Sequence, residues 1–403
     1  MLKNKERLWD FNMKLIKNAV ITTVSGEVLE NGAVLFDEKI RKIGDVWEFS
    51  DKDADEVIDL KGAYLYPGLI DAHCHIGMFE DSLGFEGDDG NEESEPITPH
   101  LRAIDAVNPF DGYFAEAKAA GVTTVVTGPG SANPIGGQFA AIKTHGICVD
   151  DMIVKAPAAM KFALGENPKS VFHSKDRTPV TRMGTAAIIR ETLYKASEYM
   201  EAWEEYYKDT EENDKPEYDI KCEALIPVLK REIPVKIHAH RADDICTAIR
   251  LAKEFSLDIT LEHCTDGECV AEIIARENIP VMLGPTLSDR SKPELKNLSF
   301  SIYKAFCEKG IKTAIITDHP ETTIDNLVLC AAMAVKNGMD RKKALEGITL
   351  TAAKNCGIDD RVGSVEVGKD ADFCVFDGDI FDFSKKNVMT FINGEKIYDK
   401  ISI

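Results

Sequence analysis

Eight short apolar segments in the middle of the chain alternate with stretches of helical periodicity, and this alternation constrains the fold more than any other feature. The segments are LYPGLIDAHCHIG, GVTTVVTGPG, QFAAIKTHG, AAMKFALG, IPVKIHAH, LDITLEHC, IPVMLGP and GIKTAIITDHP. Helical patterns occupy residues 186–208, 243–255, 267–278, 299–309 and 322–337. Apolar strands separated by helices are typical of a parallel sheet covered by helices. Eight of them predict a (β/α)8 TIM barrel, although an open doubly wound sheet would show the same alternation.

Both ends of the chain show a different pattern, with strands and turns and almost no helix. Strand-like segments fill the region before residue 67 and return after residue 356, with a hairpin signal at Asn393-Gly394. Neither end is long enough to fold well alone. We therefore expect one composite β-sandwich module from residues 13–66 and 356–403, beside a barrel of residues 67–355. Residues 1–12 are expected to be a leader of little structural weight, or to follow a mis-chosen start.

The charge balance excludes several classes of partner. The 403 residues carry 69 acidic and 48 basic side chains, which gives a formal net charge of −21. Nucleic acids and anionic membrane surfaces both need basic patches, so we expect neither as a partner. The ten cysteines are scattered without a C-x-x-C pair, and no stretch is apolar enough to span a membrane. These features favour a cytoplasmic protein with a small-molecule substrate, and a homo-oligomer is compatible with them.

Polar side chains gather where the apolar segments end. The C-terminal ends of four predicted strands carry His73 and His75, His238 and His240, His263, and Asp318. In a parallel barrel these ends form the face that holds active sites. Because side chains alternate along a strand, His73 and His75 point to the same side and can bind one divalent ion. Hydrogen-bonded core histidines and a structural ion pair at Asp318 are the alternatives to a metal site.

Lys161 lies in the middle of the segment AAMKFALG. Met160 and Phe162 on either side are expected to face the helices, which directs Lys161 into the barrel. A buried lysine must be paired, neutral or chemically changed. A neutral amine can add carbon dioxide and become a carbamate that bridges two metal ions. An ion pair with a nearby acid such as Glu166 is the alternative.

The strand-end motifs, taken in order, resemble those of the amidohydrolase superfamily. The order is HxH, Lys, HAH, EH and TD, with a β module split between both termini; YPGLIDAHCHIG and GSVEVGKDADFCVFDGD are the most specific segments. Within the superfamily the chain looks closest to the imidazolonepropionase and Xaa-Pro dipeptidase-related branch. It also resembles bacterial amidohydrolases of unassigned substrate in GPGSANPIGGQ, KFALGENPK, HAHRADDI and DHP.

This resemblance implies a distorted eight-fold barrel with a composite β module, and it implies a divalent metal, zinc being favoured. One-metal relatives use the positions of His73, His75, His238 and Asp318, whereas two-metal relatives add a bridging carbamate at Lys161 and a ligand at His263. The sequence allows one ion or two per chain. Asp318 would be both ligand and proton shuttle, and His263 would polarise the substrate in a one-metal site. His240, the second histidine of HAH, is expected to contact the substrate.

The implied reaction is hydrolysis of a C–N bond by metal-activated water, in an amide or a cyclic amide. A deaminase of the same fold, an Xaa-Pro-type dipeptidase and a non-catalytic barrel are the alternatives, although no ligand position is missing. Glu166 and Arg182, in loops beyond the strands, are expected to bind the substrate, because an arginine fork suits a carboxylate. The glycine-rich residues 128–131 and 136–138 are not a P-loop, and a tight connection is the simpler interpretation.

Overall fold

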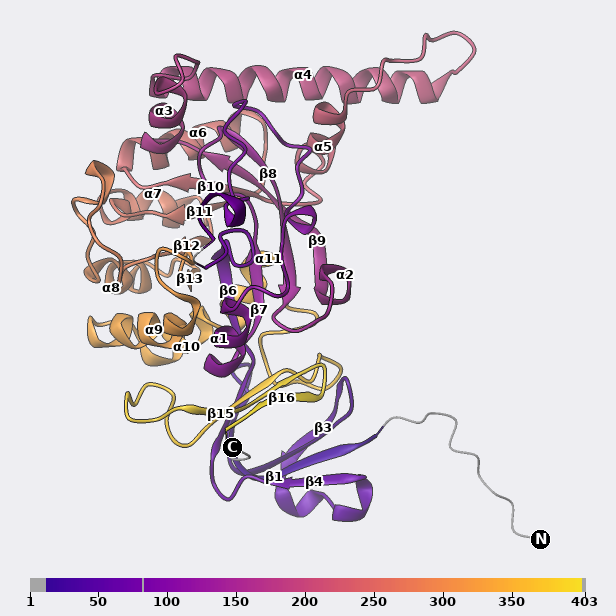
Figure 1. Cartoon of the computed structure of the whole chain (residues 1–403), viewed down its shortest axis with the longest axis vertical. Helices are drawn as coiled ribbons and strands as arrows, with labels where there is room; N and C mark the ends of the chain where they lie inside the picture. Colours follow the sequence, from indigo (N-terminus) through magenta and orange to yellow (C-terminus); the bar gives the residue numbers. More distant parts are fainter. Residues whose placement is uncertain (1–11, 82, 401–403) are drawn as a thin grey trace.

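The computed structural model describes residues 12–81 and 83–400, so the predicted leader lies almost wholly outside the described residues. Figure 1 shows a β module at one end of the molecule, a barrel with its helices in the middle, and the long α4 at the far end. Within the described residues, no helix combines the length and apolar character needed to cross a membrane.

All eight predicted apolar segments form strands of one sheet. The strands are β6 (Leu69–Cys74), β7 (Val122–Thr127), β8 (Ile135–Lys143), β9 (Ile153–Ala163), β10 (Val235–Ala239), β11 (Ile259–His263), β12 (Val281–Leu283) and β13 (Thr313–Ile315), and they neighbour one another in this order. Backbone hydrogen bonds from Asp318 to His73 (3.2 Å) and from His75 to His319 (2.9 Å) bring the last strand against the first. The sheet therefore curls into the predicted barrel rather than an open sheet.

The prediction of a wholly parallel barrel is wrong at one strand. β8 pairs antiparallel with both β7 and β9. The connection from β7 to β8 spans only residues 128–134, and a parallel crossover needs a dozen residues or more. Residues 128–131 therefore lie in the tight connection that the sequence suggested, whereas residues 136–138 belong to strand β8 and not to a turn. The antiparallel strand distorts the barrel.

The helices pack around the barrel, and five of them match the predicted helical stretches with shifted ends. The helices over residues 113–120, 149–152, 166–173, 220–229, 341–347 and 350–356 were not among the predicted stretches. The helices are α1 (Tyr113–Ala120), α2 (Val149–Met152), α3 (Glu166–His173), α4 (Arg182–Lys208), α5 (Ile220–Leu229), α6 (Ala242–Glu254), α7 (Ala271–Arg276), α8 (Ser301–Glu308), α9 (Leu327–Lys336), α10 (Arg341–Gly347) and α11 (Leu350–Cys356). The main core lies between them and the strands, where Met160 and Phe162 point, as predicted. A second core of inward residues such as Phe139 packs on Ala352 and Ala353 of α11, which fills the end of the barrel away from the site.

The two ends of the chain join in one β-sandwich sheet, as predicted. It contains β1 (Lys14–Thr22), β2 (Val28–Phe36), β3 (Ile40–Asp45), β4 (Glu56–Asp59), β5 (Tyr64–Pro67), β14 (Phe373–Phe376), β15 (Asn387–Ile392) and β16 (Glu395–Asp399). β14 pairs antiparallel with β5, so the last strands complete a sheet that the first strands begin. Phe36, Phe373 and Phe391 pack edge to face at its centre. The domain boundaries given above stay a prediction.

Candidate metal centre

Side chains from five strands meet in a cavity at the C-terminal face of the barrel. His75 follows β6, Lys161 lies on β9, His238 on β10, His263 at the end of β11 and Asp318 just after β13. All five line a cavity of about 530 Å³, and His240 lines it with them. His73 lies beneath it and is fully buried. The structure thus brings together all the residues to which the sequence assigned metal binding.

Asp318 stands at the centre of one group, the aspartate cluster of His73, His263 and Asp318. Its Oδ1 lies 3.5 Å from Nε2 of His73 and 3.3 Å from Nε2 of His75. One nitrogen or oxygen atom from each cluster member falls within 4.8 Å of the others. Donor atoms at this spacing can hold a divalent cation.

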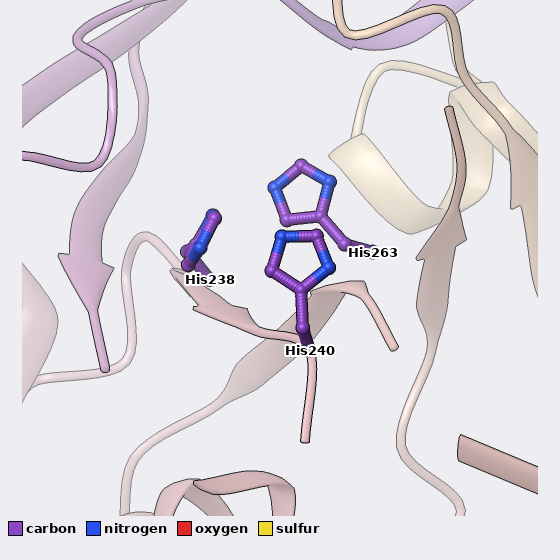
Figure 2. A group of neighbouring side chains, drawn as sticks. All are labelled: His238, His240 and His263. Carbon is purple, nitrogen blue, oxygen red and sulfur yellow. The ribbon is translucent and has the colours of Figure 1, made fainter. Parts of the chain in front are cut away.

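The three-histidine cluster of His238, His240 and His263 lies beside the aspartate cluster and shares His263 with it. Figure 2 shows the rings of His240 and His263 close together, with His238 turned nearly edge-on beside them. The ring centroid of His238 is 4.7 Å from that of His240 and 4.5 Å from that of His263. Ligand atoms of the three fall within 4.8 Å of one another.

Most of the imidazoles are oriented by a partner on Nδ1. His75 donates to the carbonyl of Gly128 (2.6 Å) and His263 to that of Gly284 (2.8 Å). Since a carbonyl only accepts, the proton is on Nδ1 and the Nε2 lone pair is free to bind a metal. This is the arrangement that ligating histidines usually have. Nδ1 of His73 lies 2.6 Å from Oε2 of Glu262, but this close contact lacks the geometry of a hydrogen bond.

His238 is the exception, and it bears directly on whether the residues fit a metal. Its side chain is buried, yet neither ring nitrogen has a hydrogen-bond partner among the described residues. A buried polar group without a partner is costly. A cation bound at a ring nitrogen would satisfy this histidine, so the donor set fits a metal.

The protonation states also suit a cation. Burial lowers the pKa of His73, His238, His240 and His263 well below the ordinary value, so these rings are neutral at pH 7 and keep a lone pair. Burial alone would raise the pKa of Asp318, but His263, His75 and Lys161 outweigh it and hold that pKa below its ordinary value. The centre therefore offers neutral nitrogens and one ionised carboxylate at its middle.

Lys161 points into the barrel, as the alternation predicted. Its Nζ lies 3.2 Å from Nε2 of His73. Burial lowers the pKa of Lys161 to about 8. Among the described residues, no carboxylate lies within 4.0 Å of Nζ, and the alternative ion pair with Glu166 does not form. About a tenth of a lysine with this pKa is uncharged at pH 7, and the uncharged amine is the form that can become a carbamate.

The two loop residues assigned to substrate binding are engaged elsewhere. The Glu166 carboxylate accepts the backbone N–H of Glu294, the Glu166 N–H donates to the Glu294 carboxylate, and Arg182 forms an ion pair with Asp244 at 3.0 Å. Neither residue lines the cavity. Their contact with a substrate stays a prediction. The residues beyond the strand ends that do line the cavity include Ser131, Lys292 and, on α3, Asn167.

Sequence reasoning missed two buried carboxylates. Glu262 ends an otherwise apolar strand segment, and that signal, already used for Asp318, could have found it. Oε2 of Glu262 also contacts Nζ of Lys236 at 3.1 Å, beneath His73. Glu294 lies in a loop between β12 and α8, where no periodicity marks it.

Comparisons with known proteins agree with one another. A family model described as the amidohydrolase family matches residues 64–397. The crystal structure of an amidohydrolase from Thermotoga maritima is 40% identical, with a TM-score of 0.92 over 96% of this chain and 100% of that chain. Amidohydrolase tasK of Hapsidospora irregularis is 30% identical over 89% of this chain, which spans only 39% of that protein. An imidazolonepropionase of Fusobacterium nucleatum is 25% identical over 87% of this chain and 86% of its own length.

Proposed function

The chain belongs to the amidohydrolase family, and from this premise we propose that it hydrolyses a carbon–nitrogen bond of a small molecule with a divalent metal ion. The observation that carries the proposal is the convergence of neutral histidines on an ionised aspartate at the floor of one cavity. An amide or a cyclic amide is the substrate class, because the similar proteins include amidohydrolases and an imidazolonepropionase.

We propose that His73, His75, His238 and Asp318 hold one ion. Imidazole and carboxylate donors favour zinc, although they also bind manganese, iron and nickel. His263 is shared by both clusters, and Lys161, as a carbamate, is the proposed bridge to a second ion. A cavity of about 530 Å³ fits a small-molecule partner. We infer no nucleic-acid partner, because the chain carries a net charge of −21.

Asp318 and His263 would each contribute to a different part of the hydrolysis. When bound, a divalent cation supplies a nucleophilic water at neutral pH and polarises the scissile carbonyl. Asp318 is ionised and faces the cavity, so it can accept a proton from the attacking water and return it to the leaving nitrogen. His263, whose Nδ1 lies 3.8 Å from Oδ2 of Asp318, keeps its proton on Nδ1. In a one-metal site its Nε2 can therefore accept a hydrogen bond from the attacking water, rather than donate one to the substrate carbonyl.

The test combines metal analysis with product analysis. Protein purified without chelator should contain zinc or another divalent ion, and it should hydrolyse some of a panel of cyclic amides, N-acyl amino acids and Xaa-Pro dipeptides. His73→Ala should lose most of the metal and reduce kcat/KM by at least about a thousandfold, whereas His145→Ala, at an exposed position, should change neither. Unchanged metal content and activity in His73→Ala would refute the assignment. Ammonia released from an amidine would identify a deaminase instead.

A further inference from the structure

We propose that Glu294 is an additional metal ligand, and that with His238, His240 and His263 it forms a second cation position. This inference rests on the proposed metal chemistry and makes it more specific. It replaces the Lys161 carbamate with Glu294 as the anionic donor of the second position. It also moves His238 from the first ion to the second, and it gives His240 a ligand role in place of substrate contact.

The distances around Glu294 are close to those of a coordination sphere. Its Oε1 lies 3.7 Å from Nε2 of His238 and 3.8 Å from Nε2 of His240. Ligand atoms about 2.1 Å from one tetrahedral ion are roughly 3.4 Å from each other. The third ring, His263, has a ligand atom within 4.8 Å of those of the other two. Glu294 is outside the group whose ligand atoms all lie within 4.8 Å of one another, so its carboxylate and the histidines would have to approach by about 1 Å or more to share one ion.

The second carboxylate oxygen is held by the backbone, which fixes the direction of the first. Oε2 of Glu294 accepts the backbone N–H of Glu166 at 3.1 Å, and Oε2 of Glu166 accepts the N–H of Glu294 at 3.3 Å. This reciprocal pair ties the loop after β9 to the loop after β12 across the mouth of the barrel. Glycine at position 165 leaves room for the Glu294 carboxylate, because a Cβ at that position would lie only 2.9 Å from Oε2 of Glu294. Metal-binding carboxylates are commonly anchored in this way through their other oxygen.

The charges around Glu294 call for a cation. Its side chain is only 3% exposed, and a buried carboxylate is costly without a positive partner. The partner at hand is Lys292, whose Nζ lies 3.1 Å from Oε1 and 3.0 Å from Oδ1 of Asn167. The Lys292 side chain is 26% exposed, so it can withdraw into solvent when a divalent ion takes its place.

Lys161 belongs to the other side of the centre. Its Nζ is in contact with Nε2 of His73, a member of the aspartate cluster. Glu294, in contrast, contacts the two histidines that the aspartate cluster does not include. The two positions therefore have separate anionic donors, Asp318 for one and Glu294 for the other, with His263 between them.

The experiment is metal titration of the full-length chain. The protein is stripped with a chelator, reloaded with Zn²⁺ or Co²⁺ and desalted, and bound metal per chain is measured by mass spectrometry. The Co²⁺ visible spectrum reports the ligands. The variants are Glu294→Gln, His240→Asn, Lys161→Met and Lys292→Met. Glu166→Gln serves as the matched control, because it alters the same loop contact without removing a carboxylate from the histidines.

We expect two ions per chain in the wild type and in Glu166→Gln. Glu294→Gln and His240→Asn should each keep one ion and weaken the second by at least a hundredfold, with a changed Co²⁺ spectrum. Lys292→Met should bind the second ion as tightly as the wild type or more tightly. If Glu294→Gln does not fold, Glu294→Asp, which retracts the carboxylate by one methylene, should give the same loss in weaker form.

Three results would overturn the inference: one ion per chain in the wild type at saturating metal, two tight ions in Glu294→Gln, or loss of the second ion in Lys161→Met alone. Hydrolysis is assayed separately on the same samples. A Glu294-dependent second ion without any C–N hydrolysis would refute the proposed function and leave this site intact. Hydrolysis by a wild-type enzyme that binds only one ion would refute the second cation position and support the proposed function.

Discussion

The Nδ1 atom of His73 and Oε2 of Glu262 are 2.6 Å apart, and both residues are fully buried. We therefore expect Glu262 to orient this histidine. Glu262→Gln should keep the size of the side chain but replace the carboxylate by a weaker hydrogen-bond acceptor. The His73 imidazole should then no longer be held in one orientation. Outer-shell partners of this kind change metal affinity about 10–100-fold. Competition with a chelator measures the effect. Thr260→Val, which removes only the hydroxyl that donates to Oε1 of Glu262, should have a smaller effect. Equal affinities in all three proteins would contradict the orienting role.

Lys161 offers a prediction on pH dependence. Burial lowers its pKa to about 8, so in the metal-free protein roughly half of this amine is neutral at pH 8, against about 0.4% of an ordinary lysine. Only the neutral amine reacts with formaldehyde in reductive methylation. Labelling of Lys161, followed by peptide mass spectrometry, should rise about tenfold per pH unit up to pH 8 and then level off. Lys208, which is exposed, should continue to rise. A Lys161 profile that rises in parallel with that of Lys208 up to pH 10 would contradict the shifted pKa.

The residues around the metal centre were predictable where they lie on a strand or directly after it, and unpredictable where they lie farther along the connections between strands. Alternation along β6 and β9 was enough to predict the directions of His73, His75 and Lys161, because a strand has only two faces. Loop residues have no such period. Arg182 was expected to bind the substrate, yet its guanidinium forms an ion pair with Asp244. No sequence pattern marked Glu294, although its carboxylate lies within 4 Å of His238 and His240.

At the scale of elements, the direction of β8 shows what periodicity leaves out. An apolar run of nine residues predicts a strand in either direction, and the helix that a parallel crossover would need was missing from the sequence on both sides of β8. Residues 128–134 are too few for a crossover, and between β8 and β9 only the four-residue helix α2 intervenes. The length of the connections, rather than the pattern of the strands, therefore carried the information on direction.

Gly165, between β9 and α3, is the element boundary on which the position of Glu294 depends. Its φ of +87° disfavours a side chain, and a Cβ would meet Oε2 of Glu294 at 2.9 Å and Oδ2 of Asp244 at 3.1 Å. Gly165→Ala should lower the free energy of unfolding by about 1–3 kcal/mol, because it adds backbone strain and a steric contact. Urea denaturation measures this.

Gly62 provides the control for that substitution. It also has a positive φ, +88°, but a Cβ there meets nothing within 4 Å. Gly62→Ala should therefore show only the backbone part of the cost. A Gly165→Ala variant as stable as Gly62→Ala would mean that Glu294 and Asp244 yield without strain.

At the scale of the whole molecule, the β module and the barrel are joined by a buried ionic contact. Nζ of Lys143, at the end of β8, lies 2.9 Å from Oδ2 of Asp370 and 2.5 Å from Oδ2 of Asp372, just before β14. The side chains of all three are at most 4% exposed. The sequence predicted that the two chain ends share a module, but not this contact, since nothing in a pattern of strands pairs a barrel lysine with an aspartate more than 200 positions away.

Removing that lysine should destabilise the molecule as a whole. Lys143→Met leaves two carboxylates buried without their main cation, and breaking a buried pair typically costs about 3–5 kcal/mol. Lys39 also binds Asp370, but its side chain is 38% exposed. Lys39→Met should therefore cost no more than about 1 kcal/mol, as surface pairs do. Urea unfolding gives both values, and hydrogen exchange at β14 shows where the loss falls. Because Lys143 connects the two sheets, its loss should raise exchange in β14 and β5 more than in β10 and β11, which carry the histidines. Equal unfolding free energies for the two variants would show that this junction contributes no more to the fold than a surface ion pair.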